Sequence, residues 1–217
     1  MDETMVEAVT RAVRVIVPRD MKNPSKKIPA SRGMHVTIIM CVSADGTFIT
    51  PTFILPLKHF PEDCTSLAHR YHWAGQEEGW ITEGIFSDWI LKVFLPFVNR
   101  RRQLMNVPEQ PVLLWVDGHS SRGSPTALQA LIDNKVTLAT IPSHTSHILQ
   151  PLDCGVNRAL KHHLRAKQLA ISEENMAEYR RTLLSAADYG IHHALYHGIV
   201  SSALHEHVLP SLSRTKS

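Results

Sequence analysis

The chain has 217 residues, of which 43% are hydrophobic, enough for one domain with a proper core and marginal for two. Its 23 basic and 20 acidic residues give a net charge of +3, which excludes an acidic tail or a polybasic coat. The mean hydropathy of −0.12 predicts no membrane span, and acids among the first residues argue against a secretory signal. Three cysteines without metal-type spacing fit reduced thiols in a cytosolic or nuclear protein.

The first predicted element is a β-hairpin. After a polar loop over residues 20–33, two apolar and β-branched runs occupy residues 35–42 and 47–55. Asp45 and Gly46 lie between them, and this dipeptide favours a tight turn because glycine tolerates a positive φ. The stretch from residue 56 to residue 79 is predicted to be irregular.

Helices and short apolar strands then alternate, in the order helix 87–98, strand 111–116, helix 124–132, strand 136–141, helix 153–169 and a last helical stretch 174–207. Ser87 is the expected N-cap of the first helix, and Ser124 with Pro125 opens the second. Both strands are expected to be buried on both faces. The order predicts a mixed α/β fold in which an antiparallel hairpin leads into parallel crossovers.

Two aspartates stand at the ends of these elements. Asp117 follows the apolar run 112–116, at the carboxyl end of a strand, where ligands of such sheets bind. A turn or N-cap aspartate is the alternative. Asp153 opens a helix, and at about 100° per residue it lies within about 20° of Leu160 and Leu164, so we expect it on the core-facing side. Its alternative is again an N-cap, favoured by the helix dipole.

The chain between Asp117 and Asp153 is long enough to return to the same rim of the sheet. Two converging carboxylates suit hard divalent cations such as Mg²⁺. A pair of such ions activates an attacking oxygen and stabilises the leaving oxygen of a phosphodiester. A third acid is needed for this chemistry, and Asp2 and Glu3 are both candidates.

Five sequence blocks occur in the order Asp2-Glu3-Thr4, HVTIIMCVSADGTFITPTFILP, GWITEGIFSDWI, LLWVDGHSSR and HTSHILQPLDCGV. Together they resemble the catalytic domain of pogo/Tigger-type DDE transposases of the mariner-like group, from Asp2 to about Lys167. The VDGHSSR and HILQPLD blocks are the most specific. The chain departs from the family pattern in having Met5 for Gly, Ser143 for Pro and Cys154 for Val.

The resemblance implies an RNase H-like fold, a mixed sheet flanked by helices, over residues 1–170, with residues 171–217 as a helical extension packed on it. It implies that Asp2, Asp117 and Asp153 form a catalytic triad that binds two Mg²⁺ (or Mn²⁺) ions. The implied reaction is hydrolysis of a DNA phosphodiester at a transposon end, followed by attack of the freed 3′-hydroxyl on target DNA. DNA is the implied partner, in the nucleus, with no membrane and no small-molecule substrate, and the resemblance leaves room for a homodimer.

In this fold the first aspartate sits on the central strand, whose residues are expected to precede Asp2. We therefore expect an amino-terminally truncated fragment that lacks most of the first strand and the upstream helix-turn-helix region. Such a fragment of a transposase is expected to have little or no activity of its own. The alternatives are a domesticated DNA- or protein-binding module without catalysis, and an RNase H-like scaffold that binds neither metal nor nucleic acid.

Basic and histidine side chains near the aspartates are candidates for contact with DNA. His119 and Arg122 follow Asp117, with hydrogen bonding inside the loop as the alternative. His144 and His147 either orient DNA or a metal-bound water, or stabilise their loop. A basic flank on the helix after Asp153 either binds phosphate or is an ordinary solvated face, and it consists of Arg158, Lys161 and Arg165.

Overall fold

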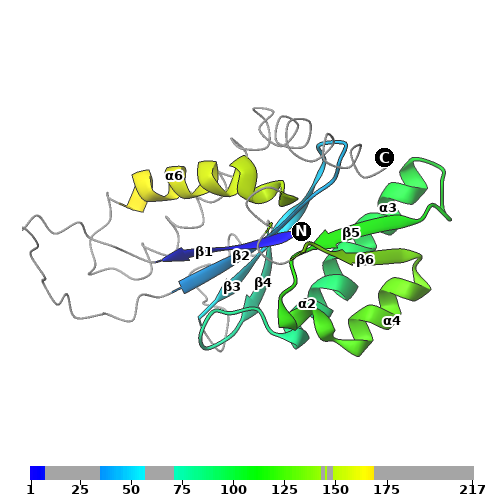
Figure 1. The fold of residues 1–217 in the computed structure, drawn as a ribbon, viewed down its shortest axis with the longest axis horizontal. Coiled ribbons are helices and arrows are strands. Elements are labelled where there is room, and N and C mark those ends of the chain that lie inside the picture. Colours follow the sequence, from blue (N-terminus) through cyan, green and yellow to red (C-terminus); the bar gives the residue numbers. More distant parts are fainter. Residues whose placement is uncertain (8–34, 57–70, 143–144, 146–148, 169–217) are drawn as a thin grey trace, which may run out of the picture.

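The computed structural model describes residues 1–7, 35–56, 71–142, 145 and 149–168, drawn as ribbons in Figure 1. Four strands form one sheet and two parallel strands form a second, with helices on both sides of the strands. This arrangement confirms the predicted mixed α/β class.

The first three strands are antiparallel neighbours: β1 (Asp2–Glu7), β2 (His35–Val42) and β3 (Phe48–Leu55). The predicted hairpin is β2–β3. Its turn places Gly46 at φ 84°, and the Gly46 amide donates to the Ser43 carbonyl at 3.0 Å. Only glycine adopts that backbone conformation without strain, which is why the Asp-Gly pair marks the turn.

Strand β1 is more complete than the sequence predicted. It runs on from Asp2 for six residues and pairs with β2 along its whole length, from Asp2 opposite Met40 to Glu7 opposite His35. Thr4 and Val6 in its middle are buried. The expectation that most of this strand would be missing is therefore wrong. It looked for strand residues ahead of Asp2, whereas the residues that follow Asp2 also favour a strand.

A fourth strand, β4 (His72–Gly75), pairs in parallel with β3 inside the stretch predicted to be irregular. The prediction is wrong because four residues are too few to show an alternating pattern. Aromatic packing holds the strand, since the ring of Trp73 stacks on Phe53 with 5.0 Å between centroids.

The first predicted helix is longer than expected and has a different cap. It consists of α2 (Glu83–Trp89), a π-helical turn η2 (Ile90–Phe94) and α3 (Leu95–Leu104). Thr82 is the N-cap, and its hydroxyl accepts the amide of the third helical residue at 3.3 Å. Ser87, the predicted cap, lies inside α2, because a β-hydroxyl residue five positions upstream starts the helix earlier.

The two parallel strands are β5 (Val112–Val116) and β6 (Val136–Thr140), joined through α4 (Pro125–Asp133). Ser124 caps α4 as predicted, with its side chain accepting the Ala127 amide. Burial of both strands on both faces is not observed. Leu113 in β5 is 57% exposed, so one face of this sheet is only partly covered.

The last described elements are a π-helical turn η4 (Leu152–Val156) and α6 (Asn157–Gln168). Val156 and Leu160 are buried, as predicted for the apolar stripe. Asp153, however, is exposed rather than core-facing. The prediction used an α-helical repeat, and a π-turn, which closes its hydrogen bonds over five residues, shifts the angular position of residues on its far side.

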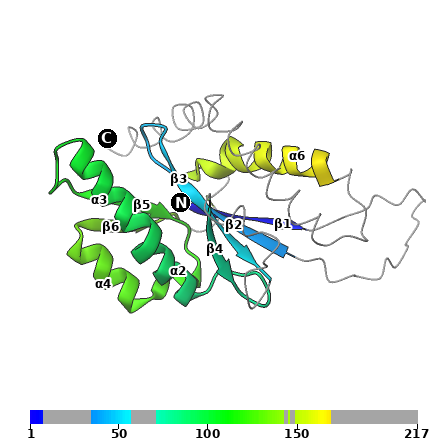
Figure 2. The same cartoon turned by 180° about the vertical axis from the view of Figure 1, so that it is seen from behind.

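The two sheets meet at the start of β1. The ammonium group of Met1 donates to the carbonyl of Trp115 in β5 at 2.8 Å, so β5 lies alongside the beginning of β1. Helix α6 lies on the opposite side of the strands from α2 and α4 (Figures 1 and 2). One hydrophobic core joins both sheets to the helices, and among its fully buried members are Ile39, Ile54, Phe86, Ile90, Val116 and Leu131.

A cavity of about 350 Å³ is lined by Met1 and by residues of β2 and β5. Its lining is mainly apolar and includes Cys41, Phe94, Leu114 and Leu152. Among the described residues, no helix is both long enough and apolar enough to span a membrane. The predicted extension over residues 171–217 lies outside the described part of the chain.

Candidate metal centre

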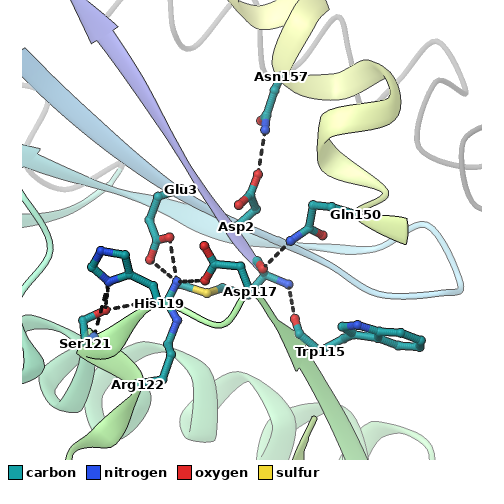
Figure 3. A network of polar contacts seen from close by, with 10 residues as sticks. Asp2, Glu3, Trp115, Asp117, His119, Ser121, Arg122, Gln150 and Asn157 are labelled. Atoms are coloured by element: carbon teal, nitrogen blue, oxygen red, sulfur yellow. Dashed lines mark hydrogen bonds and ion pairs between the residues drawn. The ribbon is translucent and has the colours of Figure 1, made fainter. Parts of the chain in front are cut away.

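Asp2 and Asp117 are brought together where the two sheets meet. Asp117 follows β5 directly, and the Met1 ammonium is hydrogen-bonded to Trp115 near the end of that strand. Asp2, the first residue of β1, therefore lies beside the carboxyl end of β5 (Figure 3). One carboxylate oxygen each from Asp2, Glu3 and Asp117 lies within 4.8 Å of the others.

Asp153 joins this group through an asparagine. The side-chain nitrogen Nδ2 of Asn157 donates to Oδ2 of Asp2 at 2.8 Å and to Oδ1 of Asp153 at 2.9 Å. A single nitrogen thus holds one oxygen from each carboxylate. Asp2 is the shared member of two acidic groups, one with Glu3 and Asp117 and the other with Asp153.

Arg122 neutralises part of this charge. It lies in the 3₁₀ turn η3 (Ser120–Gly123), and its Nη2 is 2.6 Å from a carboxylate oxygen of Glu3 and 2.7 Å from Oδ1 of Asp117. The side chain is only 4% exposed, and its guanidinium lies 5.0 Å from the ring centroid of Phe86. Arg122 therefore fixes the two acids against the end of β5.

The carboxyl group of Asp2 is electrostatically disfavoured as an anion. Its pKa is raised to about 7, mostly by burial and also by the charges of Asp153 and Glu3. The hydrogen bond from Asn157 and the charge of the Met1 ammonium act in the opposite direction. The pKa of Arg122 is raised by Glu3 and Asp117, although burial alone lowers it. Negative charge at Asp2 is therefore only partly compensated by the protein.

The donor set fits a hard divalent cation. Asp2 is buried, the side chain of Asp117 is 31% exposed and Asp153 is exposed, so the group opens toward solvent on the side of the last two. All the candidate ligand atoms are carboxylate oxygens, which Mg²⁺ and Mn²⁺ prefer. A cation here would supply the compensating charge that Asp2 lacks.

The two candidates for DNA contact that follow Asp117 are engaged locally. Nδ1 of His119 lies 2.9 Å from the Ser121 hydroxyl and accepts the Ser121 amide, although the residue is exposed. Arg122 is buried between Glu3 and Asp117. His119 thus bonds inside its own loop, as in the alternative, whereas Arg122 also reaches Glu3 in β1. Contact of either residue with DNA stays a prediction.

The remaining candidates for DNA contact are placed only in part. On α6, Arg158 is exposed and Lys161 is partly exposed. Arg165 belongs to the same helix, but its side chain lies outside the described part of the structure. His144 and His147 also lie outside the described residues. Contact of these five residues with DNA therefore stays a prediction.

Sequence reasoning missed two polar residues that organise the centre. Asn157 bridges two predicted ligands, and Gln150, which is 1% exposed, donates to the Met1 carbonyl at 3.1 Å. The only sequence signal for Asn157 is its position four residues after Asp153, the spacing of neighbours on a helix face. Gln150 carries no comparable signal, because its partner lies at the other end of the described chain.

Three curated proteins illustrate what the chain is similar to. It is 28% identical over 158 residues to Tigger transposable element-derived protein 7 of Homo sapiens. The matched region covers 70% of this chain and 28% of that protein. It is 26% identical over 126 residues to the Jerky protein of Mus musculus, a match that covers 58% of this chain and 22% of that protein. It is also 26% identical over 126 residues to the Jerky protein homolog of Homo sapiens, with 57% of this chain and 22% of that protein covered. The chain thus spans about a quarter of the length of these relatives.

The family model described as DDE superfamily endonuclease matches residues 34–203. The match covers more than half of the chain and includes Asp117 and Asp153, while Asp2 lies ahead of it. The mixed sheet with helices on both sides agrees with the RNase H-like fold of this family. The chain therefore belongs to the DDE superfamily endonucleases and is related to the Tigger-derived and Jerky proteins.

Proposed function

We propose that this chain is the metal-binding core of a DDE-type DNA endonuclease, in which Asp2, Asp117 and Asp153 bind two divalent cations, Mg²⁺ or Mn²⁺. The observation that carries the proposal is the position of Asp2, which shares one acidic group with Asp117 and a second with Asp153. A carboxylate between two others is suited to contact both ions of a pair.

The proposed reaction is hydrolysis of a DNA phosphodiester, followed by attack of the freed 3′-hydroxyl on a phosphodiester of target DNA, which joins the two strands and releases a 3′-hydroxyl of the target. The bound cations would supply activation of the attacking oxygen and stabilisation of the leaving oxygen. Arg122 orients Asp117 and Glu3, and DNA would approach from the side on which Asp117 and Asp153 are exposed. Arg158 and Lys161, on the helix that follows Asp153, neutralise phosphate charge. Action on DNA places the protein in the nucleus.

We further propose that the chain alone cleaves DNA weakly or not at all. Asp117 is already ion-paired to a buried arginine, so a cation has to compete with that guanidinium for the carboxylate. This proposal concerns the 217-residue chain by itself, which spans about a quarter of the length of its curated relatives.

A second candidate function is a DNA- or protein-binding module without catalysis, descended from a transposase. The observation that favours it is the contact of Arg122 with both Glu3 and Asp117, because this side chain offsets part of their charge without a metal ion. In this case these acidic residues would stabilise the fold through their ion pairs with Arg122 and would not bind metal.

Titration of the 217-residue chain with Mn²⁺ by isothermal calorimetry separates the two. The proposal predicts saturable binding that is lost in Asp117→Asn and in Asp153→Asn and retained in Asp133→Asn, an exposed acid on α4. Absence of binding by the wild-type chain, or binding that survives both substitutions, would contradict the metal centre. Nicking of supercoiled DNA in Mg²⁺ is expected to be weak, and strong nicking abolished by Asp117→Asn would contradict the second part of the proposal.

A further inference from the structure

Asn157 occupies an unusual place for a buried amide. It is the first residue of α6, is 4% exposed, and is held by its backbone N–H to the carbonyl of Leu152. Its side chain reaches back to Asp153 in the preceding turn and across to Asp2 in β1. The residue therefore connects a helix and a strand that lie at opposite ends of the described chain (Figure 3).

The two hydrogen bonds of Asn157 act on the same pair of acids. Both leave from Nδ2, at 2.8 Å and 2.9 Å, so the Asp2 and Asp153 oxygens cannot be farther apart than these two bonds together. Without such a donor, two carboxylates at this separation repel each other and turn apart. The amide thus keeps them close while the protein carries no cation.

The side-chain oxygen of Asn157 also indicates that this residue serves to position Asp2 and Asp153. Oδ1 of Asn157 is buried and accepts no hydrogen bond within the described residues. A buried asparagine that serves only the fold is normally satisfied at both ends. Both hydrogen bonds of the side chain go from Nδ2 to carboxylates, whereas a helix-capping side chain accepts from backbone amides.

We propose that Asn157 is a positioning residue of the metal centre, which holds Asp2 and Asp153 in the arrangement that a divalent cation needs. The inference rests on the proposed function, because it assigns a role toward the cation that those carboxylates would bind. Residues that hydrogen-bond to metal ligands typically change metal affinity by about 10–100-fold when removed. Asn157 has the contacts for such an effect without contacting the cation itself.

The test uses Asn157→Leu, which keeps the size of the side chain and removes its donor, and Asn157→Ala as a smaller second variant. Asn99→Leu is the matched control, since Asn99 is an exposed asparagine on α3. Affinity for Mn²⁺ is measured by calorimetry on the full chain, and the fold is checked by circular dichroism and melting in EDTA. We expect the Kd for Mn²⁺ to rise about 10–100-fold in both Asn157 variants, with a native spectrum, and to stay unchanged in the control.

Each outcome decides the inference. A native fold with wild-type affinity for Mn²⁺ in the Asn157 variants overturns it, while leaving the metal centre intact. Loss of the fold in both variants also overturns it, because Asn157 would then serve the fold rather than the centre. Absence of Mn²⁺ binding by the wild-type chain overturns the proposed function and this inference together.

Discussion

Asp2 combines burial with acidic neighbours. Its pKa of about 7 in the folded chain lies well above the ordinary value of 3.8 for an aspartate, which approximates the unfolded chain. Between these two values the folded state binds more protons than the unfolded state, so the free energy of unfolding falls as pH rises. Ionised Asp2 is thus a cost to the fold above neutral pH, in the absence of a cation.

This cost predicts the effect of Asp2→Asn in EDTA. The variant removes the charge but keeps the size, so at about pH 8 it should be more stable than the wild type, on the order of a few kcal/mol. The difference should shrink toward about pH 4, where Asp2 is protonated in the folded chain. Urea unfolding at both pH values measures it, with Asp133→Asn as the control. A gap that is the same at both pH values would contradict the shift.

The individual residues of the centre differ in how visible they are in the sequence. The motifs that contain Asp2, Asp117 and Asp153 identify these three as candidates. The hydrogen bonds that hold the centre together are not visible in the sequence. Arg122 and Glu3, for example, are 119 residues apart in the chain. Asn157 is equally hidden, since an asparagine near a helix start is ordinarily read as a cap or a solvated residue.

Among the elements, those with a strong local signal were predicted well. The hairpin β2–β3, the strands β5 and β6 and helix α4 each begin and end within a residue or two of the prediction, because turn residues, apolar runs and a Ser-Pro start define them. Strand β4 was missed because it is too short to show an alternating pattern, and the sequence gives no sign of the two π-helical turns. Periodicity assumes a regular helix and fails where a π-turn interrupts it.

Two substitutions at the start of α2 test whether Thr82, and not Ser87, caps the helix. Thr82→Ala removes the side-chain acceptor for the Ile85 amide and should lower the free energy of unfolding by about 1 kcal/mol. Ser87→Ala, at the cap position that periodicity suggested, lies inside the helix and should leave stability unchanged or slightly higher. Urea unfolding of the two variants compares them. A larger loss for Ser87→Ala than for Thr82→Ala would contradict the observed start of the helix.

On the scale of the whole molecule, Arg122 connects parts that no strand pairing joins. It links Glu3 in the four-stranded sheet to Asp117 at the end of the two-stranded one, and it lies over Phe86 in α2. Buried charges held this way are costly to leave without a partner. The residue thus couples the position of the acids to the packing of both sheets.

Arg122→Met should therefore destabilise the chain by about 3 kcal/mol in EDTA, because it leaves Glu3 buried without its cation. Lys92→Met, which breaks the exposed ion pair with Asp88, should change stability by no more than about 0.5 kcal/mol. Urea unfolding measures both. Adding Glu3→Gln to Arg122→Met should restore part of the loss, and an equal or greater loss in the double variant would contradict the ion-pair explanation.

The hydrogen bond between the Met1 ammonium and Trp115 also constrains how recombinant protein is prepared. An affinity tag fused ahead of Met1 would replace the ammonium with an amide at a residue that lines the apolar cavity. It would also remove a positive charge that lowers the pKa of Asp2, and so weaken the centre next to it. Tags for metal titrations therefore belong at the carboxyl end of the chain.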